Sequence, residues 1–139
     1  LCYRAESPQG LVEMQRTCWD PVLQWAASEF GASFKVQSGI THVDQPAAAL
    51  EGVAERMNDF DYLALTPLHT MTTLTGSALL VLAFAAGELD AGAVWAAAHV
   101  DEDWQISQWG QDAEAAARRE VRRAEFDADV RFLQLVRSS

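Results

Sequence analysis

Three consecutive acids, Asp101, Glu102 and Asp103, stand directly before Trp104 in the segment VDEDWQISQWGQD, which runs from Val100 to Asp112. Acids usually face water, whereas tryptophan usually buries most of its surface. Carboxylates beside an indole ring could serve as a general acid or base in an enzyme. They could also orient a protein partner beside an aromatic anchor. The segment is therefore a candidate catalytic site and a candidate partner surface.

This segment reads as the end of a helix with two apolar sides. At 100° per residue, one narrow arc of that helix collects five side chains, Trp95, His99, Glu102, Ile106 and Trp109. We expect four of them to face a core. Glu102 is the exception, because a buried carboxylate without a partner is costly. Trp104 falls on the opposite side of the helix.

The carboxylate of Glu102 has three interpretations. An arginine from the segment RREVRR (Arg118 to Arg123) could neutralise it, as is usual for buried carboxylates. It could instead lie in a groove and receive a donor from a partner. A role as catalytic acid or base is the third interpretation.

The indole of Trp104 has two interpretations. It packs against the last helix, or it is an exposed anchor ringed by polar residues, which is the composition of an interface hot spot. In the second case Asp101 and Asp103 would set the orientation and the association rate of the partner.

The three histidines favour no particular enzyme. His42, His69 and His99 belong to no HExxH motif, and the chain has no glycine-rich phosphate loop or nucleophile elbow. His99 and Glu102 form an i,i+3 pair that could hold one metal ion weakly. We expect His99 and His69 to be core histidines instead, and we expect no catalysis, metal or cofactor. A small metal-dependent hydrolase or lyase using His69, His99 and Glu102 remains the rival hypothesis.

Composition excludes some classes of function. Half of the 139 residues are hydrophobic, the net charge is −10 and the sequence pI is about 4.5. An acidic globular chain is a poor ligand for nucleic acid, which needs a basic face. The RREVRR segment spreads its charges around a helix with acids nearby, so we interpret it as a solvated, salt-bridged surface.

Cys2 and Cys18 lack metal-ligand spacing, which favours a reducing compartment. A disulfide between them is the alternative.

The pattern of apolar residues and helix breakers predicts a mainly α domain of about five helices with one short β element. The helices are expected from Ser7-Pro8 to Gly31 with a kink at Pro21, from Asp44 to Met57, from Asp61 to Ala86, from Asp90 to Trp109, and from Asp112 to Arg137. In the second helix, Leu50, Val53 and Met57 are expected to face inward. The short link at Gly110 predicts that the last two helices form an antiparallel hairpin. The β element is expected within residues 33–39.

The most apolar run, Leu74 to Gly87, is shorter than the roughly 20 residues that a membrane span needs, so we expect no stable membrane insertion.

Several separated motifs resemble the assembly chaperones that act on the α subunit of the ATP synthase catalytic head. The motifs are CYRA (Cys2 to Ala5), Trp19-Asp20-Pro21, the apolar run LTGSALLVLAFAAGELD, and DEDWQISQWG. The resemblance covers nearly the whole chain and rests on several separated motifs. The resemblance implies a non-catalytic chaperone that holds the unassembled α subunit until it meets β, without nucleotide or metal. A helical adaptor for some other protein partner is a second rival.

The resemblance falls on two groups of residues. We expect the first group to contact the client: Asp101, Glu102, Asp103, Trp104 and Gln105. We expect the second to be a structural motif: Trp19, Asp20, Pro21, Trp109 and Gly110. This division rests on helix geometry and is not part of the family pattern.

The resemblance also implies a domain organisation. In the family, the CYRA strand belongs to a larger protein with an N-terminal β-rich domain. Residues 1–7 are therefore expected to be a strand or linker from a missing upstream β domain, itself a partner in the full-length protein, and residues 8–139 a single helical domain. The family occurs in mitochondria and in α-proteobacteria. The alanine-rich, lysine-poor composition favours a bacterial cytoplasm, with the mitochondrial matrix as the alternative.

Overall fold

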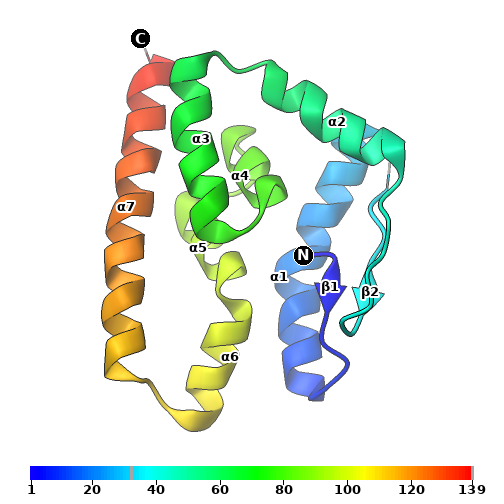
Figure 1. The fold of residues 1–139 in the computed structure, drawn as a ribbon, viewed down its shortest axis with the longest axis vertical. Coiled ribbons are helices and arrows are strands. Elements are labelled where there is room, and N and C mark those ends of the chain that lie inside the picture. The colour runs from blue at the N-terminus through cyan, green and yellow to red at the C-terminus, as the bar shows by residue number, and fades with distance from the viewer. Residues whose placement is uncertain (32, 139) are drawn as a thin grey trace.

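The computed structural model describes residues 1–31 and 33–138, and Figure 1 shows the arrangement of their elements. These residues form seven α-helices and one sheet of two short strands. The elements are β1 (Tyr3–Arg4), α1 (Gln9–Phe30), β2 (Gln37–Ser38), α2 (Ala47–Asn58), α3 (Tyr62–Thr75), α4 (Ala78–Ala85), α5 (Ala91–Ala98), α6 (Val100–Trp109) and α7 (Ala113–Ser138). The prediction of a mainly α fold is confirmed, but the expected number of about five helices is wrong.

The helix expected from Asp61 to Ala86 is two helices. Gly76 ends α3 with φ of 72°, a left-handed conformation that glycine adopts without a steric penalty. Ser77 then begins α4 as its N-cap, because its hydroxyl accepts a hydrogen bond from the Leu80 amide at 3.2 Å. The chain turns at these two residues. This turn brings the apolar α4 back into the middle of the molecule.

The helix expected from Asp90 to Trp109 is also two helices. Asp90 caps α5 as expected, accepting from the Ala93 amide at 2.7 Å. His99, with φ of −118° and ψ of 22°, then separates α5 from α6. Because the two helices are not continuous, side chains before and after His99 do not share a single helical face.

The N-terminal strand pairs within the chain. Tyr3 and Arg4 lie opposite Gln37 and Ser38 in a parallel register, so the expected β element is present, and residues 3–4 are not an isolated strand.

The α1 helix runs unbroken through Pro21 to Gly31, where φ is 69°. The expected cap by Ser7 is wrong, because Pro8 occupies the N-cap position and no side chain caps the helix.

The expected hairpin of the last two helices is wrong. The α7 helix packs mainly along α3, whereas α6 packs against α1, and Figure 1 shows α6 and α7 diverging from their short link. Arginines of α7 explain the preference. Arg122 donates to the Leu74 carbonyl at 2.7 Å and Arg137 to the Ala85 carbonyl at 2.6 Å, at the C-terminal ends of α3 and α4. A guanidinium there meets carbonyls without helical partners.

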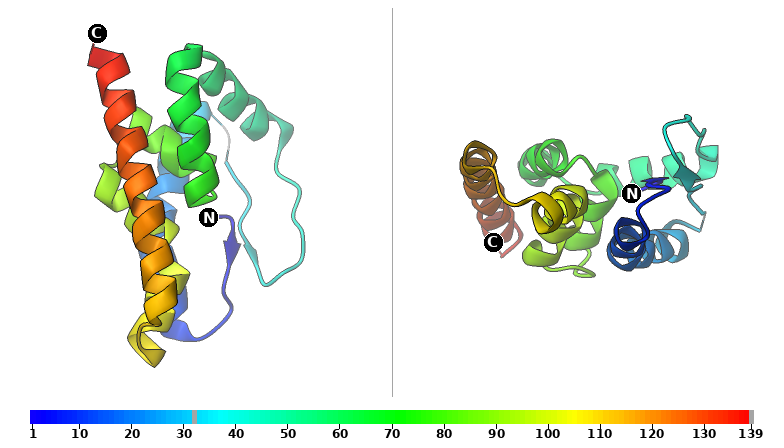
Figure 2. Two further views of the ribbon diagram at one scale, coloured as in Figure 1. Left: turned by 60° about the vertical axis from the view of Figure 1, so that its left-hand side comes forward. Right: turned by 90° about the horizontal axis from the view of Figure 1, so that it is seen from below.

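The core surrounds α4, whose side chains are buried on nearly every side. The largest fully buried side chains come from several helices: Phe126, Leu68, Met71, Leu80, Leu82 and Leu133. Seen from below in Figure 2, α7 forms one edge of the molecule, and β2 and α2 form the other.

In α2 the expectation that Leu50 faces inward is wrong, because 54% of this residue is exposed. Among the described residues, no helix is long and apolar enough to cross a membrane.

Candidate partner-binding surface at the end of helix α6

A buried glutamine holds the start of α6 in place. Gln15 of α1 is only 3% exposed. Its side-chain amide donates to the Asp101 carboxylate at 2.7 Å, and its carbonyl accepts from the Ala5 amide at 2.8 Å. A buried amide must satisfy its hydrogen bonds, so Gln15 fixes β1, α1 and α6 relative to one another. Asp101 is therefore engaged within the protein, although the residue remains exposed.

Trp104 is half-buried and lies on α1. A Cβ atom added to Gly10 would come within 2.4 Å of the Trp104 ring, so only glycine leaves room for the indole. Trp104 thus packs against the first helix, and not against the last one as in the first of its two interpretations. This contact uses the ring to join α1 and α6.

The carboxylate of Asp103 pairs with α7. Arg119 lies 2.5 Å from Asp103 and 3.8 Å from Glu102. An arginine of the RREVRR segment is therefore near Glu102, but it is closer to Asp103. The hydrogen bond that Arg119 donates to the Asp103 carboxylate raises the pKa of Arg119. The side chain of Glu102 keeps 36% exposure, and its carboxylate is available to a further donor.

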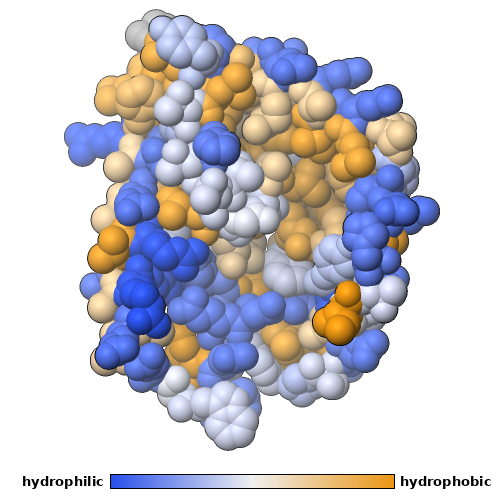
Figure 3. Space-filling model, viewed as in Figure 1, coloured by the Kyte–Doolittle hydropathy of each residue, from blue (hydrophilic) through white to orange (hydrophobic). Residues whose placement is uncertain are grey.

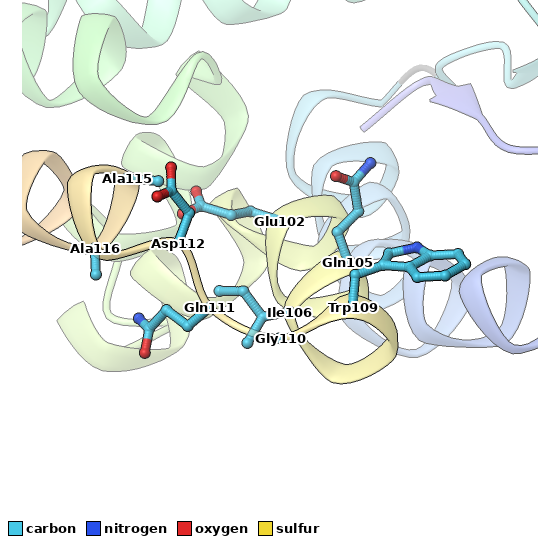
Figure 4. Close-up of a pocket in the computed structure, with 9 residues that line it drawn as sticks. All are labelled: Glu102, Gln105, Ile106, Trp109, Gly110, Gln111, Asp112, Ala115 and Ala116. Carbon is cyan, nitrogen blue, oxygen red and sulfur yellow. The ribbon is translucent and has the colours of Figure 1, made fainter.

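A pocket of about 160 Å³ lies where α6 meets the start of α7. Its lining includes Glu102, Gln105, Ile106, Trp109 and Asp112. Figure 4 shows the carboxylates of Glu102 and Asp112 pointing to the same side, while Gln105 and Trp109 project together from another side of α6. The pocket therefore offers two acids next to apolar surface.

Trp109 is the most exposed large side chain of this region. It is 86% exposed, so the expectation that it faces the core is wrong. Trp109 is the last residue of α6, and Gly110 follows it with φ of 86°, which turns the chain toward α7. An exposed indole at a helix end, beside acids and amides, has the composition of an interface anchor.

The histidines do not form a metal site. His69 is exposed, so the expectation that it is a core residue is wrong, whereas His99 is buried at 4% exposure as expected. Within the described residues, no group of three or more His, Cys, Asp or Glu side chains could hold a metal ion. Cys2 and Cys18 are both free thiols.

His99 is held in its neutral form. Its Nδ1 lies 2.7 Å from the Trp95 carbonyl, which can only accept, so Nδ1 carries the proton and donates. Its Nε2 is buried without a hydrogen-bond partner. Burial is the largest influence and lowers the pKa of His99, and the nearby Arg119 and Arg122 act in the same direction.

The lowered pKa of His99 predicts a loss of stability in acid. Below about pH 6.5 the unfolded chain binds a proton at His99 that the folded chain does not, so the free energy of unfolding falls as pH decreases toward the lower folded pKa. We expect the stability difference between wild type and His99→Gln to be constant above about pH 7.5 and to shift against wild type as the pH falls below about 6.5. Urea denaturation at several pH values measures it. A difference that stays flat across this window would contradict a neutral buried His99.

Two motifs that are distant in sequence converge on one contact. Arg4 of β1 forms an ion pair with Asp20 at 2.8 Å, and its guanidinium lies 5.3 Å from the centroid of the Trp19 ring. Trp19 is 8% exposed and donates from Nε1 to the Ala97 carbonyl at 2.7 Å. These contacts join β1, α1 and α5. Trp19 is thus a buried residue, and Pro21 is an exposed residue within α1.

Comparison with solved structures gives close matches, whereas no protein-family model matches the chain. Atp12 from Paracoccus denitrificans is 36% identical, with a TM-score of 0.91 over 96% of this chain. Its D202K mutant gives a TM-score of 0.92 at the same identity. Atu1473 from Agrobacterium tumefaciens, a candidate chaperone, is 48% identical, with a TM-score of 0.91 over 96% of this chain. The chain spans 57% of the Atp12 chains and 50% of the Atu1473 chain.

Proposed function

Because this chain belongs to the Atp12 family over the segment that it spans, we propose that it is an assembly chaperone for ATP synthase. It binds the unassembled α subunit of the catalytic head and shields the surface that α later buries against β. Such surfaces aggregate when they stay open. Binding must therefore protect the client, yet remain weaker than final assembly so that β displaces the chaperone.

The observation that carries the proposal is the likeness to Atp12 along 96% of the chain. It is supported by the position of the sequence motifs. CYRA and Trp19-Asp20-Pro21 meet in the contact between Arg4 and Asp20, and the acidic-aromatic motif forms α6.

Glu102, Gln105 and Trp109 are the residues that we propose for direct contact with the client. They line the pocket at the end of α6, and the Trp109 ring is 86% exposed. The other members of the expected partner-binding group are engaged inside the protein: Asp101 with Gln15, Asp103 with Arg119 and Trp104 with Gly10. We assign them the role of positioning α6. The binding step involves no bond-making chemistry, so it needs no catalytic residue and no cofactor.

The acids of this pocket determine which side chains of the client can bind there. Glu102 and Asp112 leave negative charge beside the apolar surface of Ile106. A lysine or arginine of the client, next to an apolar side chain, complements this arrangement. Because Paracoccus denitrificans and Agrobacterium tumefaciens are bacteria, we place this function in a bacterial cytoplasm.

A capture experiment tests the proposed function. The chain is immobilised and incubated with purified α subunit or purified β subunit, and the bound fraction is measured. We expect at least tenfold more α than β to be retained, and we expect added β to release the captured α because the α–β contact is the tighter one. Equal retention of both subunits, or of neither, would argue for an adaptor with another partner.

A further inference from the structure

The long helix α7 carries two apolar stripes on opposite sides. The inner stripe, with Phe126, Val130 and Leu133, is buried in the core. At 100° per residue, a second set of apolar residues falls within about 80° on the opposite side of the helix. We call it the outer stripe, and it consists of Ala117, Val121, Ala124, Ala128 and Phe132. A helix that is apolar on two sides usually lies between two layers.

The outer stripe is exposed along its length. Val121 is 62% exposed and Phe132 is 44% exposed, and the three alanines between and before them are exposed as well. Figures 1 and 2 place α7 at one edge of the molecule, and Figure 3 shows hydrophobic residues at several heights along that edge. From Ala117 to Phe132 the stripe is about 22 Å long, at 1.5 Å per residue.

Helix propensity does not explain the large residues of this stripe. Alanine is the best helix former, so its exposed positions need no partner. Valine and phenylalanine are poorer helix formers than the glutamate, glutamine or arginine found elsewhere on α7. Their presence on a solvent face therefore indicates a function outside helix formation.

The charged residues of α7 are distributed unevenly around the helix. Arginines point inward to Leu74, Asp103 and Ala85, as described above. Seven charged residues flank the outer stripe: Glu114, Arg118, Glu120, Glu125, Asp127, Asp129 and Arg131. Arg123 pairs with Asp127 at 2.9 Å, so the flanks keep an excess of two acids. Among the described residues, Glu120 and Glu125 form no ion pair.

Two acids lie close together on one edge of the stripe, which also carries Arg118. Glu125 and Asp129 are one helical turn apart, where like charges repel. Oδ2 of Asp129 is buried without a hydrogen-bond partner. Burial is the main influence that raises the pKa of Asp129, and the charge of Glu125 adds to it. A lysine or arginine brought to this edge would pair with the exposed Glu125 and reduce this repulsion.

We propose that the outer stripe is a second docking surface for the client, and that its occupant is an amphipathic helix with an apolar stripe flanked by lysine or arginine. The inference deepens the proposed function and rests on it. Charge complementarity selects this occupant, since the flanks of the stripe carry excess negative charge. A second copy of this chain is the wrong partner, because two outer stripes would bring their acidic flanks together.

Binding of purified α subunit to the chain tests this proposal. We expect Val121→Gln combined with Phe132→Gln to weaken binding by about tenfold or more, since these are the large apolar residues of the stripe. Glutamine is a good helix former, so α7 should stay intact and the melting temperature should change by no more than about 2 °C. The matched control is Leu50→Gln on α2, which also replaces an exposed apolar residue and should bind like wild type.

Charge reversal tests the chemistry of the occupant. Glu125→Lys should weaken α binding by about threefold or more at low salt and less at high salt, whereas Glu51→Lys on the exposed face of α2 should not. A photo-crosslinker at position 121 should label a helix of α with basic residues beside its apolar stripe. Labelling of an acidic segment, or of a second copy of this chain, would overturn the assigned partner.

The two proposals fail in different ways. If wild type binds α and the Val121/Phe132 double variant binds equally well, the docking surface is wrong while the chaperone function stands. If wild type does not bind α at all, both the function and the docking surface are wrong.

Discussion

Replacing Trp109 with alanine is expected to weaken binding of the α subunit by roughly 30-fold or more while leaving the fold unchanged. The expectation follows from the exposure of this residue, which is 86%. A side chain that contributes almost nothing to the core can be removed at little cost in stability. If the indole becomes buried against the client, its truncation should cost about 2 kcal/mol or more, as is usual for a tryptophan hot spot.

Calorimetric titration of α into wild type and Trp109→Ala measures this effect, with a thermal melt of each protein beside it. Tyr62→Ala is the matched control, because Tyr62 is also an exposed aromatic residue, at 77%, and lies on α3. The control should bind normally. Equal binding by wild type and Trp109→Ala would remove the end of α6 from the interface.

Trp109, expected to be buried, is exposed, whereas Trp104 lies partly buried against α1. This difference has a physical cause. The sequence-based arc from Trp95 to Trp109 assumes one continuous helix, and that helix ends at His99. Beyond the break, α6 is oriented by Gln15, Gly10 and Arg119, which come from other parts of the chain. Local periodicity cannot describe an orientation that distant residues determine.

The ends of helices were easier to predict than breaks inside apolar segments. Asp90 and Gly31 are visible in the sequence because a capping carboxylate and a left-handed glycine act locally. Gly76-Ser77 carries the same signals, yet it lies within a run whose apolar character continues on both sides. The α4 helix is buried almost all round, so it has no polar face whose change in direction would reveal the turn.

The contact between Arg4, Trp19 and Asp20 could not be derived from spacing. The resemblance to a family pointed to the two motifs, but the ion pair and the ring contact exist only because the parallel pairing of β1 with β2 lays the first strand along α1. Arg4 has one further nitrogen, Nη2, that is buried without a partner. The guanidinium is therefore held by Asp20, by the Leu1 carbonyl, which accepts from Nε at 2.6 Å, and by the indole face.

Replacing Trp19 with alanine is expected to cause the largest loss of stability among these variants. Trp19 is 8% exposed, donates to the Ala97 carbonyl and lies under the Arg4 guanidinium. Its removal leaves a cavity, an unsatisfied carbonyl and a cation with less support. Large-to-alanine changes of buried aromatic residues cost about 3–5 kcal/mol. For a chain of this length the melting temperature should fall by roughly 10 °C or more.

Thermal and urea denaturation of three variants separates the contributions at this position. Trp19→Phe keeps most of the apolar surface and loses the hydrogen bond, so its cost should lie at about 1–3 kcal/mol, between wild type and Trp19→Ala. Trp109→Ala is the matched control, because it deletes the same side chain from an exposed site and should leave the melting temperature within about 2 °C of wild type. Equal losses for Trp19→Ala and Trp109→Ala would contradict the burial of one and the exposure of the other. A large loss for the first alone means that one tryptophan motif supports the fold, which leaves the other free to bind a client.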